Sequence, residues 1–190
     1  MNNTKKGFYT IIGSAAFALA SSATYAAGDV YFGADLGNST YKAGGVSESA
    51  TGFRLYAGMH INDNLSVEGA WLNQGDSEQS YTDPWGSGTE TVSLDGLQFS
   101  VLGKMPVQDN MDLFGRVGMY MWNASYEDIY NGSTWATADD DGSDIFFGLG
   151  MDYKISENMA VRAEYDIIAV EAFTVDVDAN RLSVGISYRP

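Results

Sequence analysis

Charged side chains recur at every second position along several stretches of the chain. Glu164 and Asp166 are two residues apart, and Arg162 precedes them by the same step. Two neighbouring carboxyl groups can act as the general acid and general base of a hydrolase. Carboxylates beside arginines instead form charge-assisted hydrogen bonds. The arginine neighbour favours ion pairing here, so we do not interpret this pair as a hydrolytic site.

An acidic run, residues 139–144, contains four aspartates and resembles a calcium-binding loop at first sight. Aligning Gly142 with the glycine of the helix–loop–helix calcium pattern puts Thr137 at position one and Gly148 at position twelve. The calcium pattern requires an aspartate at position one and a glutamate at position twelve, so neither residue fits. We therefore predict no motif-type metal site, which leaves weak divalent binding or a solvated acidic loop.

Aromatic residues lie near these acids, and they are the third group with binding potential. Exposed aromatics among acidic residues either contact a host protein or a phage, or pack the loops against one another. Both interpretations stay open. The contact candidates are Tyr81, Trp85, Tyr126, Tyr130 and Trp135.

Eight stretches position these groups, and in each of them apolar and polar residues alternate, which is the signature of a β-strand. They span residues 30–37, 53–61, 65–71, 97–104, 113–121, 145–154, 159–167 and 181–189. Short turns at 62–64, 107–110 and 156–158 alternate with expected long loops at 38–51, 74–93, 123–144 and 169–180. This order predicts an all-β fold, an eight-stranded antiparallel transmembrane up-and-down barrel with strands of about ten residues.

A soluble exported barrel also alternates, but it turns its apolar face inward. Three features favour the membrane barrel: charges and glycines on the polar face of nearly every strand, aromatics such as Trp71 and Tyr188 on the apolar face, and long loops opposite short turns. The only histidine, His60, lies beside a short turn, away from lipopolysaccharide acyl chains. We therefore expect His60 to be structural or solvated, and expect neither enzyme activity nor a cofactor.

The N-terminus resembles a secretory signal peptide. Lys5 and Lys6 precede an apolar run over 8–20, and small residues at Thr24 and Ala26 predict cleavage after Ala26. Residues 1–26 are thus the expected signal and 27–190 one barrel domain. The chain has a net charge of −15 and no cysteine, which argues against nucleic-acid binding, disulfides and thiol catalysis.

Three segments carry a family resemblance. They run from Leu102 to Trp122, from Gly150 to Tyr165, and from Leu182 to Arg189. In order and spacing they resemble the transmembrane domain of the outer membrane protein A family. Full-length members add a periplasmic domain that binds peptidoglycan; this chain stops at the barrel, so we expect no such anchoring. The chain ends at Pro190 where such barrels usually end in an aromatic residue.

The resemblance implies a cluster of ion pairs in the lumen, in which a glutamate exchanges between an arginine and a lysine. By position Glu68 is similar to that glutamate and Arg162 to that arginine. The lysine position is Leu102, so Lys104 and Arg116 are the alternative partners, with Glu164 nearby. Charges in so narrow a lumen must pair. They form either a static plug or a gated small-ion pore.

These observations predict a structural or surface protein of the Gram-negative outer membrane, with at most a small gated ion-conducting lumen. A surface adhesin, host-interaction or resistance protein acting through its loops is the alternative. The expected partners are membrane lipid and lipopolysaccharide, the barrel-assembly machinery, and a host protein or phage; no nucleic acid is expected.

Overall fold

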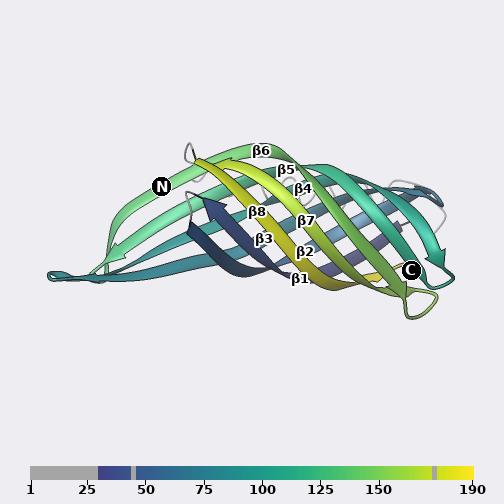
Figure 1. The fold of residues 1–190 in the computed structure, drawn as a ribbon, viewed down its shortest axis with the longest axis horizontal. Coiled ribbons are helices and arrows are strands. Elements are labelled where there is room, and N and C mark those ends of the chain that lie inside the picture. The colour runs from purple at the N-terminus through teal and green to yellow at the C-terminus, as the bar shows by residue number, and fades with distance from the viewer. Residues whose placement is uncertain (1–29, 44–45, 173–174) are drawn as a thin grey trace.

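The computed structural model describes residues 30–43, 46–172 and 175–190, so the predicted signal peptide lies outside the described residues. The described residues form eight strands. They are β1 (Val30–Ala43), β2 (Val46–Asn62), β3 (Leu65–Asp83), β4 (Gly86–Gln108), β5 (Met111–Tyr130), β6 (Ser133–Lys154), β7 (Met159–Ala172) and β8 (Val175–Tyr188). Each strand pairs antiparallel with the next, and β1 pairs with β8 to close the ring (Figure 1). The predicted fold is confirmed.

The two faces of the sheet differ sharply in character. Leu36 and Leu149 on the outer wall are 68% and 71% exposed, while Arg54 on the inner face is fully buried. Such a wall is unfavourable in water and favourable in lipid, and a closed ring leaves no backbone edge unsatisfied inside the bilayer. The polar face therefore points inward, and the soluble alternative with an apolar interior is wrong.

The loops are the main correction to the predicted fold. Residues expected in long loops continue as paired strand: β3 reaches Asp83 before β4 begins at Gly86, and β5 reaches Tyr130 before β6 begins at Ser133. The strands are 14 to 23 residues long rather than about ten. The pattern failed to reveal this because both faces of these segments meet solvent, so the apolar–polar alternation disappears.

Four strands run on past the rest of the barrel, toward the left of Figure 1. Pairing of β2 with β3 ends at Asn73, and pairing of β6 with β7 starts only at Phe146. The ladders that join β3 to β4, β4 to β5 and β5 to β6 continue to the tips. We call residues 76–93 and 123–144 the four-stranded extension. The opposite end of the barrel carries the short turns, as predicted.

Candidate functional sites in the lumen and on the extension

The lumen is crossed by an ion-pair network built from the inward positions of all eight strands. Alternation brings these charges to one face, and ring closure brings them together from distant parts of the chain. All of its carboxylates and guanidinium groups are buried, and only the Lys104 side chain keeps some exposure. Among the described residues, five acids and five bases take part, so their charges balance when all are ionised. They are Asp35, Glu68, Asp152, Glu164 and Asp166 with Arg54, Lys104, Arg116, Arg162 and Arg181.

Glu68 on β3 is held by two arginines and a tyrosine. Its Oε2 accepts from Arg162 Nη1 at 2.7 Å and from the Tyr31 hydroxyl at 3.1 Å. Its Oε1 lies 3.1 Å from Arg116 Nη1. Glu68 therefore pairs with Arg162 in the structure and has Arg116 as a second cationic neighbour.

A second centre of the network forms around Arg54 on β2. Its guanidinium donates to Glu164 Oε2 at 2.6 Å and to Asp35 Oδ2 at 2.8 Å, and lies 3.7 Å from Asp166. Glu164 also lies 2.8 Å from Arg116 Nη1, which joins this centre to the one around Glu68. Glu164 and Asp166 on β7 therefore both lie against arginines, in line with the ion-pair interpretation.

Lys104 and Arg181 depart from the sequence interpretation. Lys104 Nζ lies 3.3 Å from Asp152 Oδ2, so its ion pair is with Asp152 rather than Glu68. Arg181, fully buried, donates to Asp35 Oδ1 at 2.6 Å and was not among the predicted partners. Its position on the polar face of β8, beside Ser183, was the signal that pointed to it. Lys154 pairs with Asp112 at 3.0 Å while half exposed.

An apolar cluster fills the lumen on the extension side of the network. Its buried members come from β3 to β8 and lie closer to the tips than the network residues of the same strands. They are Leu72, Leu94, Tyr120, Trp122, Ala124, Phe146, Ile168 and Ala179. The Arg116 guanidinium lies 4.6 Å from the centre of the Phe146 ring, so the two layers touch. An ionic layer and an apolar layer therefore occupy the lumen in series.

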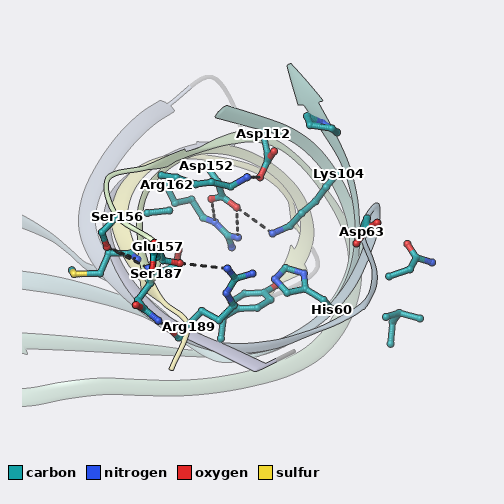
Figure 2. Close-up of a pocket in the computed structure, with 18 residues that line it drawn as sticks. His60, Asp63, Lys104, Asp112, Asp152, Ser156, Glu157, Arg162, Ser187 and Arg189 are labelled. Atoms are coloured by element: carbon teal, nitrogen blue, oxygen red, sulfur yellow. Dashed lines mark hydrogen bonds and ion pairs between the residues drawn. The ribbon is translucent and has the colours of Figure 1, made fainter. Parts of the chain in front are cut away.

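A pocket of about 470 Å³ opens at the short-turn end (Figure 2). Figure 2 shows Arg162 and Lys104 meeting Asp152 at its wall, and His60 lining another side. His60 Nδ1 lies 2.8 Å from the Ser66 hydroxyl, and its ring packs 4.9 Å from the Tyr31 ring centre. The Ser66 side chain is fully buried, so this serine–histidine pair has no access to a substrate.

Four of the predicted contact residues, Tyr81, Trp85, Tyr130 and Trp135, lie at the tip of the extension, whereas Tyr126 lies four residues before the end of β5. The rings of Tyr81 and Tyr130 stack with centres 6.2 Å apart, and Trp135 meets Tyr130 edge-on at 6.3 Å. Tyr81 lies flat against the sheet because its neighbour on β4 is Gly88; a Cβ there would overlap the Tyr81 ring. Trp85, at 83% exposed, stands away from this stack. Of the two open interpretations, packing between the hairpins therefore applies to the tyrosines.

Hydrogen bonds fix the turns at the tip. Asp83 Oδ1 accepts from the backbone of Trp85 at 2.8 Å and of Gly86 at 2.9 Å, and from the Tyr130 hydroxyl at 2.9 Å. Asn131 adopts a left-handed conformation, with φ of 49°, and its side chain accepts from the backbone N–H of Ser87 at 3.2 Å. Each hairpin turn is therefore bonded to the other hairpin. The tip is one unit rather than two independent loops.

The tip should loosen in acid because of Asp83. The Trp85 backbone N–H and the Tyr130 hydroxyl bond the carboxylate, which holds its pKa below the ordinary value. A depressed folded-state pKa gives stability that is complete above the unfolded value and is lost as pH falls through the folded value. Hydrogen exchange should therefore show steady protection of the Trp85 and Gly86 amides at neutral pH, with a decline below about pH 4. Asp83→Asn keeps an acceptor without a charge, so its protection should not change with pH; a matching decline in this variant would contradict the assignment.

The acidic run lies on β6, inside the extension. Asp144 Oδ2 accepts from the Trp122 indole N–H at 2.6 Å, so this member supports packing rather than metal binding. Among the residues that the structure describes, no group of three or more metal-ligating side chains is found, and no helix is long and apolar enough to cross a membrane.

Known proteins resemble this chain in sequence and in fold. The family model described as "Outer membrane protein beta-barrel domain" matches residues 10–189. Outer membrane protein A of Salmonella typhi is 26% identical over 172 residues, which are 84% of this chain and 47% of that protein. The same protein of Shimwellia blattae is 34% identical over 88 residues, which are 44% of this chain and 36% of that protein. The chain spans about half the length of the first of these relatives.

Two solved structures show the same fold. Neisserial surface protein A has a TM-score of 0.64 at 18% identity, covering 85% of this chain and 97% of its own. The attachment invasion locus protein Ail of Yersinia pestis, solved with the heparin analogue sucrose octasulfate, has a TM-score of 0.58 at 13% identity, covering 85% of this chain and 99% of its own. With the closed ring and its apolar outer wall, the family match establishes that the chain belongs to the outer membrane protein beta-barrel domain family and lies in the outer membrane of a Gram-negative bacterium.

Proposed function

We propose that this chain is a non-enzymatic surface protein, in which a closed barrel carries the four-stranded extension outside the cell to make contacts there. The observation that supports this most is the tip itself. Trp85 and Trp135 are 83% and 78% exposed on a turn region that hydrogen bonds hold in place. Large exposed aromatics on a fixed backbone lose little conformational freedom on binding, so they are typical of contact surfaces.

The placement of the extension outside the cell follows from the architecture. Outer-membrane barrels have short periplasmic turns and longer extracellular segments. The turns after Asn62, Gln108 and Lys154 are the short ones, and the extension lies at the other end. Its two aromatic-bearing hairpins then stand above the lipopolysaccharide surface.

We propose that the chain is not an enzyme because of where its candidate catalytic residues lie. Its one histidine is at the short-turn end, where its serine neighbour is fully buried. Acid–base use of Glu164 and Asp166 is opposed by the arginines that surround them. The matched relatives are barrel proteins of the outer membrane, which agrees with this proposal.

We do not propose that this chain binds the kind of ligand present in the Ail structure. That structure holds a heparin analogue, a polysulfate. The four-stranded extension here carries acids without a single lysine or arginine: Asp76, Glu78, Asp83, Glu90, Glu127, Asp128, Asp139, Asp140, Asp141 and Asp144. A polyanion is repelled by such a surface, and contact with anionic lipopolysaccharide needs mobile divalent cations between them. The assembly machinery and a phage remain predicted partners.

Shortening the extension should abolish surface contact without harming the barrel. One variant replaces residues 79–90 and 127–137 by two-residue Asn-Gly turns, which join the cross-strand neighbours Glu78 with Thr91 and Tyr126 with Ala138. We expect bacteria that display the full chain to adhere to cultured mammalian cells, and bacteria that display the shortened chain to adhere no better than cells lacking the protein. Electrophoresis with and without boiling checks that both barrels are folded. Equal adherence of the two chains would refute the proposal.

A gated lumen is the second candidate, and one observation favours it. Glu68 is shared by arginines of two different strands, Arg116 and Arg162, which is the arrangement that an exchange of partners requires. The apolar cluster beyond the network opposes conduction, because an ion that passed Glu68 would still meet Phe146 and Tyr120. We therefore rank the gate second.

A further inference from the structure

The lumen-side face of the extension combines rings and carboxylates in successive rows. Cross-strand partners share a face, and so does every second residue of a strand. Tyr81, Gly88 and Tyr130 form one row close to the tip, and Glu90 directly opposes Asp128 in the next row toward the barrel. This face continues the inward face of the barrel, because Asp128 and the lumenal residue Trp122 are an even number of positions apart on β5. We call it the aromatic–acidic face.

Two carboxylates on this face oppose one another without a cation between them. Asp128 is only 7% exposed and accepts from the Tyr81 hydroxyl at 2.9 Å. Burial and this bond to Asp128 raise the pKa of Tyr81 to about 12, so the hydroxyl stays a donor at neutral pH. Like charges directly opposite on a sheet destabilise it. The lumenal carboxylates, in contrast, each face an arginine or lysine.

The extension cannot supply the missing positive charge. It has ten acids and neither lysine nor arginine within residues 76–93 and 123–144. The stacked rings of Tyr81 and Tyr130 border the same carboxylates, and ring faces attract cations as well. The face is therefore complementary to a side chain that is both cationic and planar, which describes arginine better than lysine.

We propose that the aromatic–acidic face binds an arginine- or lysine-bearing segment of another polypeptide, with a cationic side chain entering between Glu90 and Asp128 against the tyrosine rings. The proposal rests on the proposed surface-contact function and names its partner class. A second copy of this chain is disfavoured, because its own extension carries the same acids. A sulfated polysaccharide is repelled. Trp85 and Trp135 at the tip would then add apolar contact around the charged centre.

The test uses the full chain, refolded in uncharged detergent micelles, and an octa-arginine peptide as probe. Glu90→Gln with Asp128→Asn removes two charges from the aromatic–acidic face. Asp139→Asn with Asp141→Asn removes two charges from the other face of the same sheet, because these residues have the opposite alternation to Asp128 in the β5–β6 register. Titration calorimetry should show peptide binding to the wild type, a loss of affinity of about ten- to a hundredfold in the first variant, and near-wild-type affinity in the second.

Three outcomes would overturn the proposal. An equal loss in the two variants would mean attraction to the net charge rather than to a site. Failure of the wild type to bind the peptide, with adherence still lost on shortening the extension, would reject the cationic partner while leaving the surface-contact function intact. Stronger binding to heparin, or to vesicles of zwitterionic phosphatidylcholine, than to the peptide would assign the face to a different class of partner.

Discussion

Arg54→Met is expected to destabilise the folded barrel by about 3–5 kcal/mol, because it leaves the five buried carboxylates of the network with only four cations. Arg54 is fully buried and lies within 2.8 Å of oxygens of both Glu164 and Asp35. Methionine fills a similar volume but carries no donor, so Glu164 would keep only Arg116 and Asp35 only Arg181, in a lumen that water reaches poorly. Urea unfolding from lipid vesicles, followed by the electrophoretic shift between folded and unfolded chain, measures the difference in unfolding free energy.

Lys154→Met is the matched control for this prediction. This variant loses a single ion pair, that of Lys154 with Asp112 at 3.0 Å, and the Lys154 side chain is 48% exposed at the mouth of the barrel. Exposed pairs contribute only about 0–1 kcal/mol, so this variant should unfold almost as the wild type does. If the two variants lost the same stability, the idea that burial makes the network essential would fail.

Phe146→Ala combined with Glu68→Ala is expected to open an ion path that neither change opens alone. After Glu68→Ala, Arg116 still lies 2.8 Å from Glu164, and Arg162 still bonds Asp152 at 2.8 Å. The ionic layer therefore persists in part, and the apolar cluster behind it is untouched. Removing the fully buried Phe146 ring breaches that second layer. It also costs about 3–5 kcal/mol through lost burial and the cavity it leaves.

Single-channel recording in planar bilayers tests this arrangement in series. The wild type and each single variant should show no resolvable openings, and the double variant should conduct. Phe147→Ala is the control, because the next residue on β6 is 59% exposed on the lipid-facing wall and touches neither layer. Openings in Glu68→Ala alone would instead support the gate at Glu68 and contradict the apolar barrier.

The alternation of residues was sufficient to predict most of the barrel wall. It predicted the strands, the short turns and the polar face, because side chains on a strand alternate strictly between two faces. It was also sufficient to place Arg54, Glu68 and Arg162 on one face. The strand ends could not be read, because the extension is solvated on both sides and its sequence carries no contrast between faces.

The apolar cluster was equally hidden in the sequence. Leu72, Tyr120 and Phe146 occupy positions of the inward, polar face, where alternation predicts polar residues. A single apolar residue among polar ones is easily taken for an exception to the alternation. Only when the ring closes do these exceptions from β3, β5 and β6 meet at one depth and become a layer.

The sequence alone therefore determined which side chains enter the lumen, because that depends only on period two. The tertiary structure decided which of them meet. Arg54 and Glu164 are 110 residues apart, Arg162 and Glu68 are 94 apart, and Arg181 and Asp35 are 146 apart. Such pairs depend on the stagger between strands around the closed ring, and the local alternation within a strand carries no information about that stagger.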